Sequence, residues 1–113
     1  MELYKQQSMF AFDVAKLLTH IQSRGLYVTF ADAYRDPAMA AIYAKKGVGI
    51  KDSLHCKRLA IDLNIFDSNG SYFAEDNPTY EELGAYWEGL NPLNKWGGKF
   101  ERRDLDHFER DPV

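Results

Sequence analysis

The sequence predicts one domain of mixed helices and short strands. Apolar residues recur at helical spacing near the N-terminus, and residues 59–65 alternate between apolar and polar as a strand does. Turn and helix-capping residues separate such segments, without a linker, a repeat or a low-complexity tract between them. A chain of 113 residues is close to the commonest size of a single domain. We therefore expect residues 1–113 to form one compact core.

The first part of the chain predicts a helix, a strand and a second helix. Residues 8–24 place five apolar side chains on one helical face, and a glycine follows. Residues 26–30 are aromatic and β-branched, as in a short strand. Asp36 and Pro37 are an N-cap and a first helical residue, and Gly47 ends the helix that they start.

The second part predicts three further strands, one of them a hairpin partner at residues 71–73, and a third helix. In residues 59–65 the alternation gives one core face and one polar face. Residues 67–70 have the composition of a turn that leads into a hairpin. Residues 79–82 form a capping box that opens a helix to about Leu90. A glycine-containing loop then leads to a last short strand, 105–109.

Composition excludes several classes of function. The net charge of -3 gives no overall positive field for a polyanion, so we expect no nucleic-acid partner. No window approaches the roughly 18 apolar residues of a membrane span, and the N-terminus lacks the pattern of a signal peptide. We therefore expect a protein made in the cytoplasm, without a membrane segment. Cys56 is the lone cysteine, so stability has to come from packing or from a metal.

Two histidines and an aspartate are candidate metal ligands. His55 ends the loop before the predicted strand 59–65, Asp62 lies on the polar face of that strand, and His107 lies in the last strand. Two imidazoles and one carboxylate suit a catalytic Zn²⁺ ion whose fourth position is open to water. Spacing alone leaves a second interpretation open, in which these histidines are packing residues that form ordinary hydrogen bonds.

Signature residues make the sequence resemble the zinc peptidoglycan peptidases. This family includes D-Ala-D-Ala carboxypeptidases, vancomycin-resistance D-Ala-D-Ala dipeptidases and phage L-alanyl-D-glutamate endopeptidases. Its first signature is matched by Ser53, His55, Ala60 and Asp62. Its second signature is matched by Trp96, Gly97, Gly98, Asp104, His107, Phe108 and Glu109. An aromatic-arginine pair, Tyr34 and Arg35, is a weaker third match, and the pattern is most similar to that of small phage endolysins.

The resemblance implies an α+β fold, a zinc ion and a set of functional residues. The fold is the one shared with the hedgehog signalling domain, a small antiparallel sheet flanked by helices with zinc on the open face. His55, Asp62 and His107 would bind the zinc, and Asp104 would act as the general base and then as the acid. Arg35 would bind the oxyanion or a substrate carboxylate, unless it forms only a surface ion pair.

The remaining signature residues have weaker assignments. Ser53 is a candidate substrate-binding residue that also suits a purely backbone-capping role, and Trp96 is a candidate wall of the cleft that also suits packing. Glu109 is expected to be structural and to point away from His107. Two departures from the family pattern are Arg58, where glycine is usual, and Asp106, where proline is common. The second makes the choice between Asp104 and Asp106 as the base less certain.

The function implied is hydrolysis of a peptide bond in peptidoglycan stem peptides. The L-Ala-D-Glu bond is the expected target, as in an endolysin. The alternatives are a carboxypeptidase or dipeptidase for terminal D-Ala-D-Ala, and a zinc-binding phage module without catalysis. We expect a monomeric catalytic domain, without a wall-binding module, that reaches the cell wall after a partner has opened the membrane.

Overall fold

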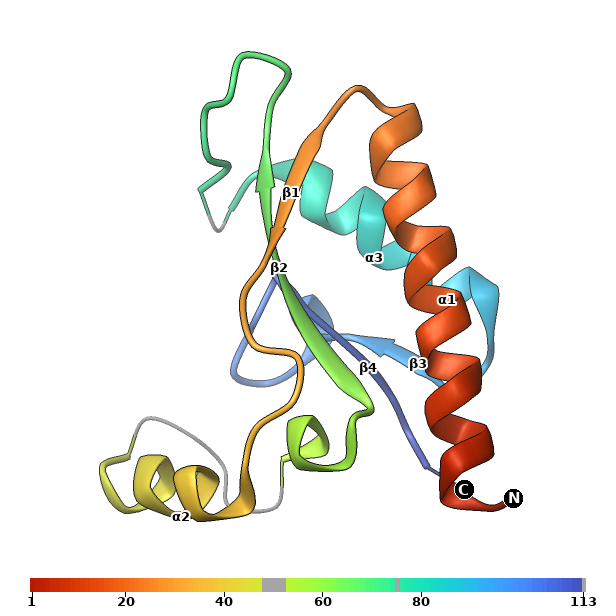
Figure 1. The fold of residues 1–113 in the computed structure, drawn as a ribbon. Helices are drawn as coiled ribbons and strands as arrows, with labels where there is room; N and C mark the ends of the chain where they lie inside the picture. Colours follow the sequence, from red (N-terminus) through yellow and green to blue (C-terminus); the bar gives the residue numbers. More distant parts are fainter. Residues whose placement is uncertain (48–52, 75, 113) are drawn as a thin grey trace.

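The computed structural model describes residues 1–47, 53–74 and 76–112. The chain forms α1 (Leu3–Ser23), β1 (Tyr27–Phe30), α2 (Pro37–Lys45), β2 (Ala60–Phe66), α3 (Pro78–Leu90), β3 (Asn94–Trp96) and β4 (His107–Arg110). Two 3₁₀ turns, η1 (Leu54–Lys57) and η2 (Gly97–Lys99), lie between them. The four strands form an antiparallel sheet in the order β1-β2-β4-β3 (Figure 1). The α+β class with a small antiparallel sheet is thereby confirmed.

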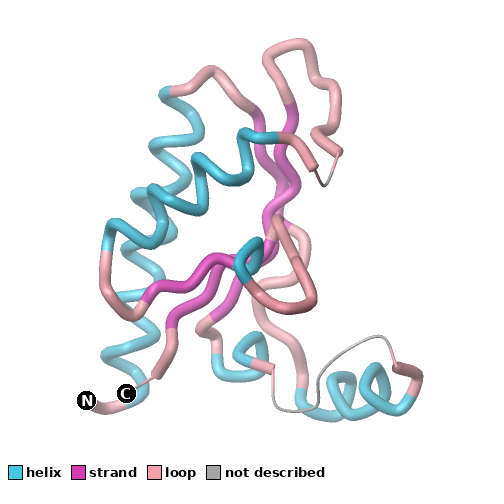
Figure 2. The backbone as a smooth tube through the Cα atoms, turned by 180° about the vertical axis from the view of Figure 1, so that it is seen from behind, coloured by secondary structure: helices cyan, strands magenta, loops and turns pink. Residues whose placement is uncertain are grey.

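Helices α1 and α3 lie on the same side of the sheet, as Figures 1 and 2 show from opposite directions. The buried core fills the space between them and the sheet. From β2 it receives Ile61, Leu63 and Ile65, while Asp62 and Asn64 are only partly buried. The alternation predicted for this strand is thus confirmed, and the polar side chains are left on the open face of the sheet.

Helix α1 is longer than its apolar pattern predicts. It begins at Leu3 rather than near residue 8, and Gln6 in its early part is almost fully buried. The Gln6 side-chain oxygen accepts a hydrogen bond of 3.3 Å from Nε of Arg110, which is itself buried. The buried face of α1 therefore begins with a polar residue. A prediction based on the spacing of apolar residues does not include it.

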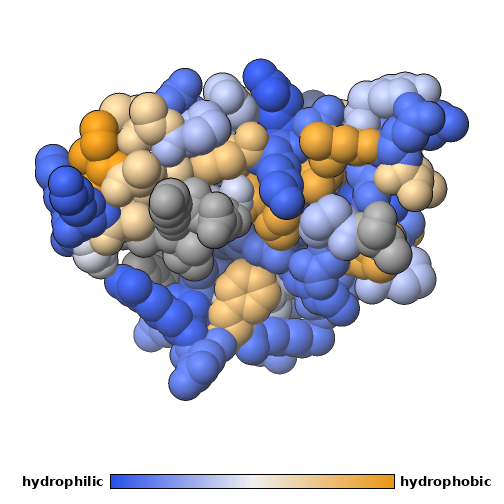
Figure 3. All heavy atoms as spheres, turned by 90° about the horizontal axis from the view of Figure 1, so that it is seen from below, coloured by the Kyte–Doolittle hydropathy of each residue, from blue (hydrophilic) through white to orange (hydrophobic). Residues whose placement is uncertain are grey.

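Helix α2 lies at the periphery and buries little of its surface. Asp36 caps it as predicted, because its carboxylate accepts the backbone N–H of Ala38 at 2.8 Å. Only Ala40 is buried in this helix, whereas Met39 and Ile42 are exposed. Figure 3, which views the molecule from below, shows tan and orange side chains over α2 at the left, bordered by blue ones. No helix in the described ranges has the length and apolar character to cross a membrane.

Two details of the second half differ from prediction. Asn77, rather than Thr79, is the N-cap of α3, and its side chain accepts the N–H of Thr79 at 2.9 Å. Pro78 occupies the first turn, which pre-sets the helical backbone two residues earlier than the capping-box pattern implies. Residues Asn94–Trp96 form a strand, β3, where a loop was expected. The last strand, β4, begins at His107 rather than at residue 105.

The contact between α3 and β3 requires a glycine at position 84. A side chain there would overlap the ring of Trp96, which is 4% exposed. We predict that Gly84→Ala lowers the free energy of unfolding by about 1–3 kcal/mol, because the ring has no space to move. Gly89 in the same helix has no atom within 4 Å of such a Cβ. Gly89→Ala is the matched control and should raise stability by up to about 1 kcal/mol in urea unfolding.

Candidate metal centre and active site

Strand pairing brings Asp62 and His107 together. Asp62 in β2 lies directly opposite His107 in β4, although 45 residues separate them in the chain. Opposed residues of an antiparallel pair have side chains on the same face. Nδ1 of His107 is 2.9 Å from Oδ1 of Asp62. The register of two neighbouring strands therefore fixes this part of the site.

The 3₁₀ turn η1 delivers His55 to the same place. Ser53 caps the turn, since its Oγ accepts the backbone N–H of His55 at 3.2 Å. Nδ1 of His55 contacts the carbonyl oxygen of Ala33 at 3.1 Å, and Nε2 faces Oδ2 of Asp62 at 3.3 Å. His55 is 3% exposed, so its ring is fixed by packing as well as by this contact. A backbone carbonyl can only accept a hydrogen bond, so Nδ1 of His55 donates to Ala33. Nε2, which faces Asp62, then carries the lone pair that a metal would need.

Arg58, which replaces the usual glycine of the signature, adopts the left-handed conformation that glycine favours. Its φ angle is 55°, and it terminates η1. Its guanidinium carbon lies 4.0 Å from the ring centroid of Tyr34, so a cation–π contact holds the arginine over the segment that leads to Arg35. The left-handed end of η1 is therefore formed here by arginine, without a glycine.

The three candidate ligands have the spacing that a metal requires. One donor atom from each of His55, Asp62 and His107 lies within 4.8 Å of the others. Donor atoms around a tetrahedral zinc with bonds of about 2.0–2.1 Å lie about 3.3 Å apart. The His55 Nε2 to Asp62 Oδ2 distance is 3.3 Å. The two imidazole rings meet edge to face with centroids 5.1 Å apart. These donors therefore fit a small divalent cation.

The charges of the cluster also favour a cation. Burial alone would raise the pKa of Asp62, but hydrogen bonds with His107 and His55 outweigh it and lower that pKa to about 2. Burial alone would lower the pKa of His107, whereas hydrogen bonds with Asp62 and Glu109 raise it to about 9. The carboxylates around His107 therefore favour a positive charge at this position, whether on the ring or on a bound cation.

Asp104, the predicted base, lies at the edge of this cluster. Its Oδ2 is 3.9 Å from Nδ1 of His107, and its side chain is 53% exposed. Its backbone N–H donates to the carbonyl of Gly97 at 3.0 Å, and a Cβ on Gly97 would overlap the carbonyl of Asp104. The glycine of the Trp-Gly-Gly loop therefore permits the close approach that positions Asp104.

Asp106 lies beside Asp104 and Asp62, and its environment differs from theirs. Burial, then a hydrogen bond with Asp104, then the charges of Asp62 and Asp104 raise the pKa of Asp106 to about 7. When protonated, Asp106 donates its hydrogen bond to the Asp104 carboxylate. The partly buried Asp106 is thus a neighbour that supports the exposed Asp104, rather than a second group open to solvent.

Arg35 reaches the site through the backbone of its own segment. Its N–H donates to the carbonyl of His55 at 3.2 Å, and Nη2 forms an ion pair with Asp32. Nε of Arg35 is buried and has no hydrogen-bond partner among the described residues. One donor of this guanidinium is therefore unused, while its backbone is tied to His55.

Trp96, predicted to contact substrate, lies in the core instead. It is 4% exposed, and its indole N–H donates to the carbonyl of Leu105 at 2.7 Å. Its burial and this hydrogen bond support the alternative of packing, while Trp96 also belongs to the lining of the pocket described next. Its position supports the loop that carries Asp104.

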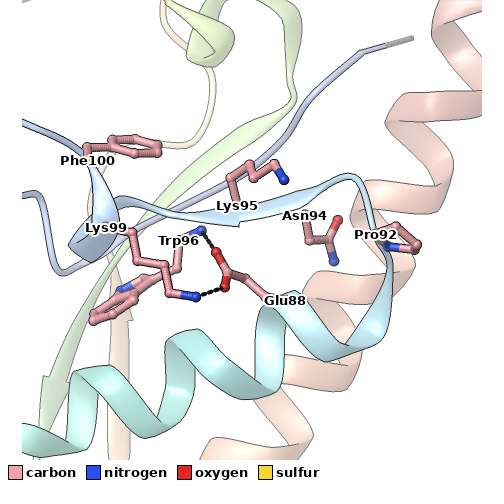
Figure 4. A pocket seen from close by; sticks show the side chains of 7 residues that line it. All are labelled: Glu88, Pro92, Asn94, Lys95, Trp96, Lys99 and Phe100. Atoms are coloured by element: carbon pink, nitrogen blue, oxygen red, sulfur yellow. Dashed lines mark hydrogen bonds and ion pairs between the residues drawn. The ribbon is translucent and has the colours of Figure 1, made fainter.

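A pocket of about 380 Å³ borders this loop (Figure 4). Glu88 closes one side, where its carboxylate accepts the N–H of Trp96 at 3.0 Å and Nζ of Lys99 at 2.6 Å. The described lining residues include none of the three candidate ligands, but Phe100 belongs to the lining and its ring centroid lies 5.8 Å from that of His107. The pocket is therefore next to the metal cluster, not over it.

Glu109 was expected to point away from His107, and this expectation is wrong. Oε1 of Glu109 lies 2.7 Å from Nε2 of His107. Residues two apart in a strand share a face, so the period-two rule itself places Glu109 beside His107. The same rule, applied correctly, would have found this contact from the sequence.

The α+β fold gathers two histidines and two aspartates on the open face of its sheet, an arrangement that could hold a metal ion. The chain belongs to a family of zinc peptidoglycan peptidases, because residues 46–110 match the family described as D-alanyl-D-alanine carboxypeptidase. The matched range contains His55, Asp62, Asp104 and His107, whereas Arg35 precedes it. This membership supports a peptidase activity on peptidoglycan.

The fold is similar to that of a solved peptidase. The crystal structure of the L-Ala D-Glu endopeptidase ChiX from Serratia marcescens superimposes with a TM-score of 0.64 and 16% sequence identity. The alignment covers 76% of this chain and 68% of that chain. A comparison with curated proteins finds no match. The likeness to the endopeptidase concerns the fold.

Proposed function

We propose that this chain is a zinc-dependent endopeptidase that cuts the L-Ala-D-Glu bond of peptidoglycan stem peptides. The observation that carries the proposal is the position of Asp62 between His55 and His107, with the exposed carboxylate of Asp104 at the edge. Membership of the peptidase family supports the reaction class.

His55, Asp62 and His107 are the residues that would hold the zinc. Each imidazole has one nitrogen engaged by a protein oxygen and the other directed to Asp62. When bound, the zinc would polarise a water molecule and the substrate carbonyl. The ligands supply one negative charge and two neutral nitrogens, which leaves the ion a net positive charge toward the substrate.

Asp104 would move the proton. Its exposed carboxylate accepts a proton from the attacking water, and it returns that proton to the amine that leaves the cut bond. Asp106 lies beside this carboxylate, and burial together with Asp104 and Asp62 raises the pKa of Asp106 to about 7. Arg35 would use its free Nε–H, or a reoriented guanidinium, to bind the oxyanion or a substrate carboxylate.

The substrate contact of Ser53 remains a prediction. Its Oγ is occupied as the cap of η1, and its side chain is partly buried. A role in holding His55 is supported by this contact. The segment before it, 48–52, lies outside the described residues.

A D-Ala-D-Ala carboxypeptidase is the second candidate function, because the matched family carries that description. A carboxypeptidase needs a closed pocket with a positive group for the free carboxylate of its substrate. Residues 91–103 are glycine-bearing and include only one short strand and one 3₁₀ turn, which favours an open cleft. A zinc-binding module without catalysis is disfavoured, since an acid is retained at position 104. We also propose that the domain is monomeric and meets the wall only after its release from the cytoplasm.

Mass spectrometry of digested peptidoglycan tests the bond that is cut. We expect stem peptides with a new D-Glu amino terminus, L-Ala left on the glycan strand, and free D-Ala-D-Ala intact. D-alanine alone in the digest would support the carboxypeptidase instead. No release from any wall preparation by zinc-loaded protein would favour the binding module.

A further inference from the structure

Glu109 contacts the nitrogen of His107 that faces away from Asp62. The two residues are two positions apart in β4, on the open face of the sheet, and Oε1 of Glu109 lies 2.7 Å from Nε2 of His107. The side chains of Glu109 and His107 are 15% and 10% exposed. A charge-assisted hydrogen bond of this length, largely shielded from water, holds the ring more firmly than a contact with solvent would.

The neighbours of Glu109 keep its carboxylate in place. In the sheet it lies opposite Ala60 of β2 and Lys95 of β3. Burial, the charge of Glu109 and a hydrogen bond with it raise the pKa of Asp111, so Asp111 also engages this carboxylate. The backbone of Glu109 is thus paired with a strand on each side, which positions its side chain beside His107.

The two candidate imidazole ligands are supported differently. Nδ1 of His55 faces a neutral backbone carbonyl, that of Ala33, whereas Nε2 of His107 faces the carboxylate of Glu109. A ring nitrogen that binds a metal carries no proton, so the other nitrogen carries it and donates it as a hydrogen bond. A carboxylate acceptor makes the ring a stronger electron donor than a carbonyl does.

We propose that Glu109 is a positioning residue that holds the Nε2–H tautomer of His107 and so presents Nδ1 to the metal. This inference rests on the proposed zinc site. Without Glu109 the ring has no fixed partner at Nε2, and rotation about its Cβ–Cγ bond competes with binding through Nδ1.

Zinc affinity measured by competition with a chelator tests the proposal. We expect Glu109→Ala to weaken zinc binding about 10- to 100-fold, the range for loss of a hydrogen-bond partner of a metal ligand. Glu109→Gln keeps an acceptor oxygen and should recover most of that loss. Glu101→Ala removes the same kind of side chain from an exposed position and should bind zinc as the unaltered protein does.

Nuclear magnetic resonance of ¹⁵N-histidine in the zinc-loaded protein gives a readout that a purely structural role would not change. The unaltered protein should show His107 with a protonated Nε2 and a metal-bound Nδ1, and Glu109→Ala should show a second population bound through Nε2. Unchanged affinity and an unchanged tautomer in Glu109→Ala would overturn the role of Glu109 while the zinc site stands. Absence of zinc binding by the unaltered protein would overturn both.

Discussion

Alanine at His55, Asp62 or His107 is expected to remove tightly bound zinc and reduce peptidase activity to background. Each residue provides one of the three donor atoms within 4.8 Å of one another, and two donors hold zinc poorly. Asp62→Ala also leaves two buried imidazoles without their shared carboxylate. Metal analysis of the purified variants and assays on peptidoglycan measure both effects, with one zinc per chain expected before substitution.

The third histidine of the chain provides the control. His20 belongs to α1 and its side chain contacts α3, where Nε2 lies 2.9 Å from Glu82 and the ring stacks on Tyr86. His20→Ala should keep zinc and activity. A chelator should abolish the activity of the unaltered protein, and added Zn²⁺ should restore it. Zinc at 100 times its dissociation constant should also stabilise the fold by about 2.7 kcal/mol. Full zinc retention in all three ligand variants would rule out this site.

Asp104→Asn is expected to keep zinc and fold but lose roughly 10²- to 10⁴-fold in kcat/KM, the range for a removed general acid-base group. The amide has almost the shape of the carboxylate but cannot accept the proton. Because the Asp104 side chain is 53% exposed, its substitution should have little effect on unfolding. Rates on a soluble stem peptide, together with zinc content and a melting curve, separate loss of chemistry from loss of structure.

Asp106→Asn is the matched comparison, since it makes the same change, a carboxyl oxygen replaced by an amide nitrogen, at the neighbouring residue. An amide at position 106 still donates a hydrogen bond to Asp104, as the protonated carboxyl does, so the loss in rate should be far smaller. A large loss in Asp106→Asn with a small one in Asp104→Asn would show that Asp106 is the base.

Much of the fold follows from local patterns. The alternation in β2 and the Asp36 cap of α2 depend on a few adjacent residues, and both are found as predicted. β3 was missed because Asn94, Lys95 and Trp96 have no strand alternation of their own. Its place depends on pairing with β4 and on the Glu88 side chain, which accepts the N–H of Trp96. Such contacts arise between distant segments, so no short window of sequence contains them.

The candidate site was predictable as a set of residues but not as an arrangement. The signature residues indicated His55, Asp62, His107 and Asp104, whereas the register that pairs Asp62 with His107 appears only in the folded sheet. The carbonyl of Ala33 as the support for His55 had no signal, because every residue has a carbonyl. Trp96 was placed at the cleft because an aromatic residue beside two glycines fits a rim as well as a core.

The last of the four strands in chain order lies inside the sheet, with β2 on one side and β3 on the other. During translation His55 and Asp62 are synthesised well before His107. The growing chain therefore holds an incomplete donor set, and the proposed zinc site cannot form until β4 has been made. β4 lies between β2 and β3, so a truncation before His107 should remove zinc binding although most of the chain is still made.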